Sequence, residues 1–206
     1  MTKFPASRYP RSLRRFGVNT TGVAAIEFAY LAPLLILATF GTFEVARAVL
    51  MHKRFQRVSA MVGDLVAREQ QIGTNVNQAR AEMDGIMASA QHVMKPFSTT
   101  TLKVSVMAIR AKSDDATKTK IEWSYGFQGG AEPAQCANKG MPVTGMITQG
   151  NAAIMVEAEY TYTPLLANLV PGFSNAITWK DTITHSPRNS CVDYAGQNCV
   201  LNCPSW

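Results

Sequence analysis

Glu27 is the residue whose position first raises a question of chemistry. It directly precedes a run from Phe28 to Phe43 that contains no charged side chain. A carboxylate at the edge of hydrocarbon costs a few kcal/mol unless it is paired or lies near the aqueous interface. Two interpretations follow. Glu27 either begins a helix at the interface, where it complements the helix dipole, or it is paired with a positive charge.

The cysteines form a second group with defined chemistry: Cys136, Cys191, Cys199 and Cys203. All four lie C-terminal to the apolar run, and an even number in a loop-rich region is typical of disulfides formed in an oxidising compartment. Four cysteines allow three connectivities, and the sequence does not choose among them. A zinc site is the alternative, but there is no CxxC pair and His185 is the only nearby imidazole.

Catalytic motifs are missing from the sequence. The histidines His52, His92 and His185 do not have metal-ligand spacing such as HExxH, and there is no GxSxG, Walker or GxGxxG motif. We therefore expect no enzymatic activity, no cofactor, no metal and no small-molecule substrate.

Two further groups could be mistaken for sites. Glu157 and Glu159 share one predicted strand face, which is typical of a solvated surface more often than of a paired-carboxylate site. Trp123, Tyr125 and Phe127 alternate with polar residues, which favours core packing over a platform for sugars or bases.

The apolar run requires a helix if it enters a membrane. A span needs about 20 mostly apolar residues, and lipid offers no partners for free backbone groups. The stretch from Gly22 to Leu50, GVAAIEFAYLAPLLILATFGTFEVARAVL, meets this length if the flanking carboxylates lie near the interfaces. We predict a single transmembrane helix over residues 23–44.

The charge of the chain is concentrated before this helix. The formal net charge is +6, and residues 1–22 hold Lys3, Arg8, Arg11, Arg14 and Arg15 but no acid. Of the 20 Lys and Arg residues, 15 remain after residue 22, against 14 Asp and Glu, so the rest is nearly neutral. A short basic leader before an apolar segment is typical of targeting, and we expect no nucleic-acid partner.

The orientation depends on the cysteines. Five basic residues precede the span and Arg47, Lys53, Arg54 and Arg57 follow it, so the positive-inside rule barely favours a cytoplasmic N-terminus. Disulfides would place the C-terminal part outside the cytoplasm. The four basic residues after the span are most simply an interfacial anchor.

Helical periodicity continues past the span. Apolar residues three and four apart predict one buried face on a helix that reaches about residue 70: Val45, Val49, His52, Phe55, Val58, Val62, Leu65 and Val66. A second helix is capped by Asn75 and ends at Lys95-Pro96.

After Pro96 the period changes to two, which is typical of strands. We predict strands around residues 102–108, 121–127, 154–162 and 177–183, a loop over 129–150 and a short helical turn between Pro164 and Phe173. Together with the helices this is an α+β fold. The predicted parts are a basic leader (1–22), the span (23–44), a helical segment (45–95), an antiparallel sheet domain (96–188) and a cysteine-rich tail (189–206).

The start of the apolar run resembles a known family. Residues 25–35, AIEFAYLAPLL, with Gly22 before them, resemble the N-terminal segment of the TadE/TadG-like family, pilin-like proteins of the tight-adherence (Flp-type) pilus system. The resemblance is specific over about residues 15–50. It implies a bacterial inner-membrane protein with a periplasmic C-terminal domain.

The resemblance also implies a processing site. In type IV prepilins a peptidase cuts after a small glycine, so here Gly22 would precede the cut, Val23 would become the N-terminus and Glu27 the fifth mature residue, followed by the aromatic Phe28. The new amine of a neighbouring subunit would then pair with Glu27 and set the register between subunits. Pro33 either serves ordinary helix packing or forms a hinge for leaving the bilayer.

Three classes of function remain. The first is a pilin-like protein (minor pilin or pseudopilin) that acts in the assembly of a Flp-type, type IVb pilus, with a prepilin peptidase, other pilin subunits and the assembly machinery as partners. The second is a membrane-anchored periplasmic binding or adaptor protein that is not processed. The third is an anchored enzyme without a recognisable motif. The Gly22–Phe28 pattern favours the first.

Overall fold

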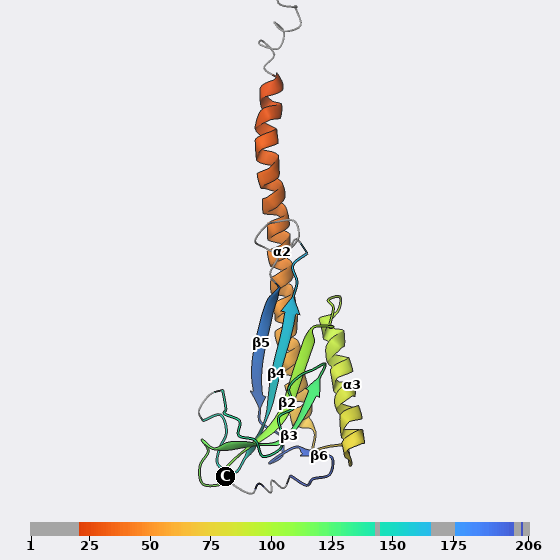
Figure 1. Cartoon of the computed structure of the whole chain (residues 1–206), viewed down its shortest axis with the longest axis vertical. Helices are drawn as coiled ribbons and strands as arrows, with labels where there is room; N and C mark the ends of the chain where they lie inside the picture. Colours follow the sequence, from red (N-terminus) through yellow and green to blue (C-terminus); the bar gives the residue numbers. More distant parts are fainter. Residues whose placement is uncertain (1–20, 143–144, 166–175, 200–202, 204–206) are drawn as a thin grey trace, which may run out of the picture. The chain divides into compact units, whose positions relative to one another are not determined.

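The computed structural model describes residues 21–142, 145–165, 176–199 and 203. It has two long helices and a four-stranded antiparallel sheet (Figure 1), which confirms the predicted α+β class. The chain divides into two compact units, Met1–Ala46 and Arg47–Trp206. Nearly all of the predicted basic leader and most of the predicted helical turn at 164–173 lie outside the described residues.

The two helices are α2 (Thr21–Arg68) and α3 (Val76–Met94). Asn75 caps α3, since its side chain accepts a hydrogen bond from the backbone N–H of Gln78 at 3.0 Å. This N-cap satisfies one of the donors that a helix start leaves free. The helix ends at Met94, directly before Lys95-Pro96, as predicted, because proline cannot continue it.

The sheet has the strand order β3-β2-β4-β5, and all neighbours are antiparallel. Its strands are β2 (Leu102–Ala111), β3 (Thr119–Phe127), β4 (Ala152–Tyr162) and β5 (Ile177–His185). All four predicted strands are therefore confirmed. Two short strands, β1 (Gln71–Ile72) and β6 (Asp193–Tyr194), form a separate parallel pair. The tail that was predicted to be only a loop thus contains a strand.

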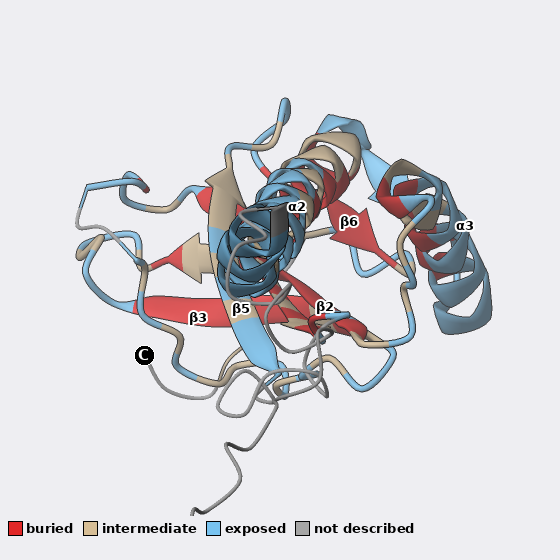
Figure 2. Cartoon of the chain, turned by 90° about the horizontal axis from the view of Figure 1, so that it is seen from above, coloured by how far each residue is buried: buried red, intermediate tan, exposed pale blue. Residues whose placement is uncertain are grey.

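The main core of the C-terminal unit lies between the helices and one face of the sheet. Its fully buried members from α2 are Phe55, Val58, Val62 and Val66, and α3 contributes Ala79, Met83, Met87, Ala90 and Met94. Figure 2 shows these buried residues of α3, in red, on the side of the helix that turns toward β6. Burial of this apolar area supplies most of the stabilisation of the unit.

The predicted buried face of α2 was wrong at its beginning. Val49 is 48% exposed, whereas Met51 is 2% exposed and joins the core. The face is correct from Phe55 onward. The stretch up to Leu50 keeps its large apolar side chains exposed.

A β-bulge in β3 moves the side chains on its two sides to opposite faces of the sheet. Ala108 pairs with Trp123, but the next residue, Ile109, pairs with Ile121, so Glu122 is skipped. One extra residue reverses the alternation of side chains. Trp123 therefore packs in the main core, while Ile121 lies in a second cluster with Met107, Ile109 and Met155. Ile121 and Trp123, two residues apart, therefore lie on opposite faces of the sheet, contrary to the strict alternation of a regular strand.

The loop over residues 129–150 covers this second cluster. Ala137 and Met141 pack against it. The loop also bonds to the edge of β3, since the N–H of Cys136 donates to the carbonyl of Ile121 at 2.8 Å and the N–H of Ile121 donates to that of Ala137 at 3.0 Å. Met107 is buried for this reason.

Candidate functional site

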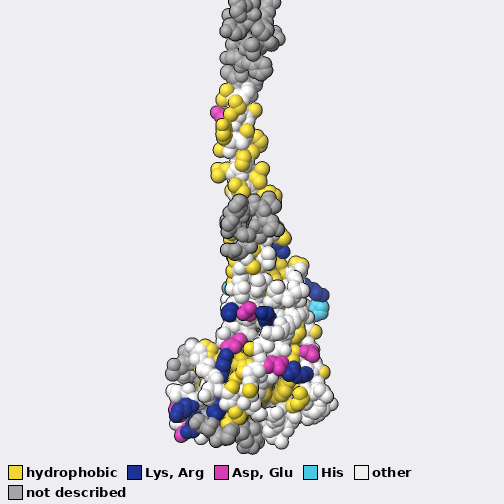
Figure 3. Space-filling model, viewed as in Figure 1, with side chains coloured by type: hydrophobic (Ala, Val, Ile, Leu, Met, Phe, Trp, Pro, Cys, Tyr) yellow, Lys and Arg dark blue, Asp and Glu magenta, His cyan; other side chains and the backbone are white. Residues whose placement is uncertain are grey.

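The N-terminal part of α2 presents an apolar surface on all sides. From Phe28 to Phe43 its large apolar side chains are between 53% and 80% exposed, and in Figure 3 this part of the helix is covered by yellow apolar side chains. In the described part of the chain, α2 is long and apolar enough to cross a membrane, by length and composition. An apolar surface of this extent calls for a partner such as lipid or other apolar helices.

The two threonines of this stretch are satisfied within the helix. The hydroxyl of Thr39 donates to the carbonyl of Leu35 at 2.8 Å, and that of Thr42 donates to the carbonyl of Ala38 at 2.7 Å. Such bonds leave no free hydroxyl donor, so neither threonine opposes a hydrocarbon environment. The helix continues through Pro33, whose missing N–H removes one intrahelical bond.

The residues of the predicted processing site lie in the first two turns of α2. Val23 and Glu27 are four residues apart and therefore lie on one helix face, about 6 Å apart along the axis. Both are exposed, as is Phe28 at 67%. A side chain at Gly22 would meet no other atom within 4 Å, so folding of this chain does not require glycine there.

All four cysteines are paired. The disulfides are Cys136–Cys203, with Cα atoms 5.5 Å apart, and Cys191–Cys199, with Cα atoms 6.2 Å apart. One of the three possible connectivities is thereby selected. In the described ranges, no group of three His, Cys, Asp or Glu side chains could hold a metal ion.

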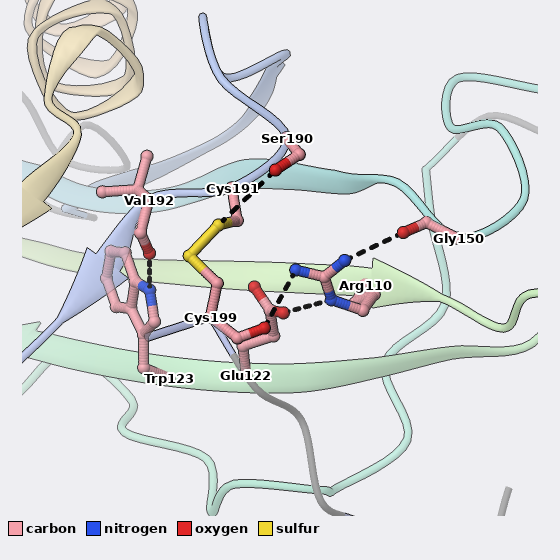
Figure 4. The surroundings of a disulfide bond; sticks show 8 residues. All are labelled: Arg110, Glu122, Trp123, Gly150, Ser190, Cys191, Val192 and Cys199. Carbon is pink, nitrogen blue, oxygen red and sulfur yellow. Dashed lines mark hydrogen bonds and ion pairs between the residues drawn. A yellow bond between two sulfur atoms is a disulfide. The ribbon is translucent and has the colours of Figure 1, made fainter. Parts of the chain in front are cut away.

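A buried ion pair lies beside the Cys191–Cys199 disulfide (Figure 4). Arg110 contacts Glu122, and their side chains are 18% and 6% exposed. Arg110 also donates to the carbonyl of Gly150 at 2.9 Å. Burial raises the pKa of the Glu122 carboxyl above its ordinary value, against the opposing effect of Arg110. The sequence pattern did not indicate this pair, because the bulge at Glu122 is set by strand register.

The aromatic residues of β3 do not form an open platform. The indole N–H of Trp123 donates to the carbonyl of Val192 at 2.9 Å, and its ring stacks on Tyr194 at 4.9 Å between centroids. Tyr125 is buried and donates to Asp84. Burial and the contact with Asp84 both raise the pKa of the Tyr125 hydroxyl.

Glu157 and Glu159 are each matched by lysine rather than by each other. Glu157 pairs with Lys139 at 2.5 Å, and Glu159 lies 3.7 Å from Lys103 and 3.3 Å from Lys180. Glu159 thus forms cross-strand ion pairs with β2 and β5, and Glu157 pairs with a lysine of the 129–150 loop. It does not hold two free carboxylates for acid–base chemistry.

Comparison with known proteins addresses the N-terminal helix alone. No curated protein and no solved structure matches the chain. A family model described as "TadE-like protein" matches residues 22–63, which lie within α2 and include Gly22, Glu27 and Pro33. The resemblance predicted from Gly22 to Leu35 is thereby confirmed, and the similarity extends over nearly the whole of α2.

Proposed function

We propose that this chain is a pilin-like membrane protein that acts in the assembly of a tight-adherence (Flp-type) pilus. The observation that carries the proposal is the TadE-like match over residues 22–63 on a helix whose apolar side chains are exposed from Phe28 to Phe43. A helix with this surface suits a bilayer and, equally, the packed helices of a filament core.

The proposed mechanism begins with cleavage after Gly22 by a prepilin peptidase. Cleavage removes the basic leader and leaves a free amine on Val23, one helical turn from Glu27. A carboxylate at the edge of hydrocarbon is costly when unpaired, so the amine of a neighbouring subunit would be attracted to Glu27. Because both groups lie on one helix face, this pairing would fix the axial register of two neighbouring α2 helices.

The orientation belongs to the same proposal. Both disulfides lie in the C-terminal unit, and disulfides persist in oxidising compartments. We place this unit in the periplasm and the N-terminus in the cytoplasm, with one span of the inner membrane between them. The periplasmic unit would then present its surface to other pilus components.

The test is the N-terminus of the mature protein. Intact-mass measurement on protein purified from its native membrane should give a chain that begins at Val23. Gly22→Leu should retain the leader because the peptidase needs a small residue before the cut. Gly41→Leu is the matched control, since a side chain at Gly41 also meets no other atom within 4 Å, and it should be processed normally.

The opposite result has a clear meaning. If the wild-type chain keeps residues 1–22, the pilin role loses its support. A periplasmic binding or adaptor domain tethered by an uncleaved anchor is then the better description.

A further inference from the structure

Two segments of the chain, which meet at the end of α3, carry several cations and no carboxylate. Residues 45–63 and 85–113 contain no Asp or Glu. In the same segments Arg47, Lys53, Arg54, Arg57 and Lys95 carry positive charge. The acids that flank these segments in sequence are Glu44, Asp64, Asp84 and Asp114. Glu44 is buried, Asp84 accepts a hydrogen bond from Tyr125, and Asp114 pairs with Lys112.

The fold brings these two segments together. A guanidinium nitrogen of Arg54 donates to the carbonyl of Lys95, just past the end of α3. The guanidinium groups of Arg47 and Arg54 also lie 5.7 and 5.6 Å from the centre of the Phe97 ring. The beginning of the C-terminal unit on α2 and the C-terminal turn of α3 therefore form one surface. In Figure 3 basic side chains lie beside a histidine at the upper end of α3, with no acidic side chain next to them.

One of these cations already makes a contact within the fold, whereas three others are exposed to solvent. Arg54 is engaged with the carbonyl at the end of α3, where a cation offsets the helix dipole. Lys53, Arg57 and Lys95 are exposed and no ion pair is found for them among the described residues. Lys53 and Arg57 are four residues apart and so point to the same side of α2.

A groove beside Lys95 adds neutral hydrogen-bonding groups. It has a volume of about 460 Å³ and is lined by Gln91, His92, Lys95, Ser98 and Thr100, among others. The hydroxyls of Ser98 and Thr100 lie 3.0 Å apart. This groove suits a phosphate ester, because the ammonium, imidazole, amide and hydroxyl groups around it can donate hydrogen bonds to phosphate oxygens.

The position of this surface along α2 selects the source of the phosphate. Val49 and Leu50 are 48% and 58% exposed, so apolar surface continues to Leu50. Lys53 and Arg57 follow Leu50 by three and seven residues, which is about 5 to 10 Å along a helix. The polar layer of a bilayer is about 5 to 8 Å thick on each side. Measured from Leu50, Lys53 therefore falls within the headgroup layer, and Arg57, at about 10 Å, lies just above it within reach of its long side chain.

We propose that Lys53, Arg57 and Lys95, with the groove at Ser98 and Thr100, bind the headgroup of an anionic phospholipid. The proposal rests on the membrane span of the proposed function but not on cleavage or on pilus assembly. Headgroup binding would hold the C-terminal unit against the bilayer surface in one orientation, because the contacts come from both α2 and the end of α3.

The experiment measures lipid preference with the full chain in a bilayer. Spin-labelled phosphatidylglycerol and spin-labelled phosphatidylcholine are compared in phosphatidylcholine membranes, and the motionally restricted fraction gives the relative association constant. The wild type should prefer phosphatidylglycerol. Each cation removed near the surface is expected to lower that preference about five-fold. The triple variant Lys53→Gln, Arg57→Gln, Lys95→Gln should bring it to parity.

The matched control removes the same charges elsewhere. Lys112→Gln, Lys118→Gln, Arg188→Gln also changes two lysines and one arginine in the C-terminal unit, and it should keep the wild-type preference. Equal loss in both triple variants, or no preference in the wild type, overturns the proposal. So does competition by millimolar inorganic phosphate at constant ionic strength, which would indicate a free-phosphate site.

Insertion is checked first by extraction at alkaline pH. A chain that is released from the membrane refutes the span and the headgroup site together. A chain that stays inserted but shows no lipid preference refutes the headgroup site alone.

Discussion

The two disulfides should contribute unequally to stability, and the structure predicts by how much. Cys136–Cys203 closes a loop of 67 residues that includes β4 and β5, whereas Cys191–Cys199 closes a loop of only 8 residues. A cross-link stabilises mainly by restricting the unfolded chain, and the effect grows with the logarithm of loop length. Serine pairs at each disulfide are therefore a direct test of the chain-entropy argument on this fold.

The magnitudes follow from the loop lengths. Loop-closure entropy gives about 4.4 kcal/mol for the separation of 67 residues and about 2.5 kcal/mol for the separation of 8. The double variant Cys136→Ser, Cys203→Ser should therefore lose more free energy of unfolding than Cys191→Ser, Cys199→Ser, by about 2 kcal/mol.

Guanidinium unfolding of the full chain in detergent is the assay. All three tryptophans, Trp123, Trp179 and Trp206, lie in the C-terminal unit, so intrinsic fluorescence follows its unfolding. The wild type under reducing conditions should match the variant that lacks all four cysteines. A larger loss for Cys191→Ser, Cys199→Ser would refute the entropy argument and would assign the main stabilisation to the local contacts around Arg110.

Four further variants test the C-terminal core and the span. Arg110→Met leaves the buried Glu122 carboxylate without its partner and should cost about 3 kcal/mol of unfolding free energy. The pKa of Glu122 is raised in the folded state, so the folded chain holds this proton more tightly than the unfolded chain does. The contribution of Glu122 to stability is therefore full at low pH and falls as the pH rises above the pKa of the unfolded state. A profile of unfolding free energy against pH for Glu122→Gln should lack that fall. Gly63→Ala places a methyl group against the ring of His185 and should destabilise the fold by about 1 to 3 kcal/mol in a thermal melt. Pro33→Ala removes the proposed hinge, and timed extraction from membranes should be slower for it than for the wild type.

The two destabilising variants of the C-terminal core, Arg110→Met and Gly63→Ala, have controls that separate their causes. Adding Glu122→Gln to Arg110→Met should recover part of the loss, because no charge then remains buried. Gly85→Ala is the control for Gly63→Ala, since its methyl group would meet nothing within 4 Å and should stabilise α3 by about 0.5 to 1 kcal/mol. Equal effects at the two glycines, or unchanged extraction of Pro33→Ala, would contradict the respective interpretation.

Much of the fold follows from local sequence patterns. The apolar run from Phe28 to Phe43 predicts a helix because its composition and length leave few alternatives. Asn75 and Pro96 mark the ends of α3 because capping and the missing proline donor act within one turn. The period of two predicts the four strands for the same reason: the pattern needs only neighbouring residues.

Features that depend on distant residues were not predictable in this way. The bulge that skips Glu122 depends on how β3 aligns with β2, and it moves Ile121 to the other face of the sheet. The same alignment brings Arg110 to Glu122. Met107 is buried only because the 129–150 loop folds over it.

The sequence by itself determined the apolar helix, the TadE-like segment within it and the α+β class, because each is encoded by residues that are close together along the chain. Only the tertiary structure decided the disulfide pairing, the parallel β1–β6 pair and the basic surface shared by α2 and the end of α3. Apart from Cys191–Cys199, whose cysteines are 8 residues apart, these join residues tens of positions apart, so their geometry is set by strand register and helix packing rather than by local propensity.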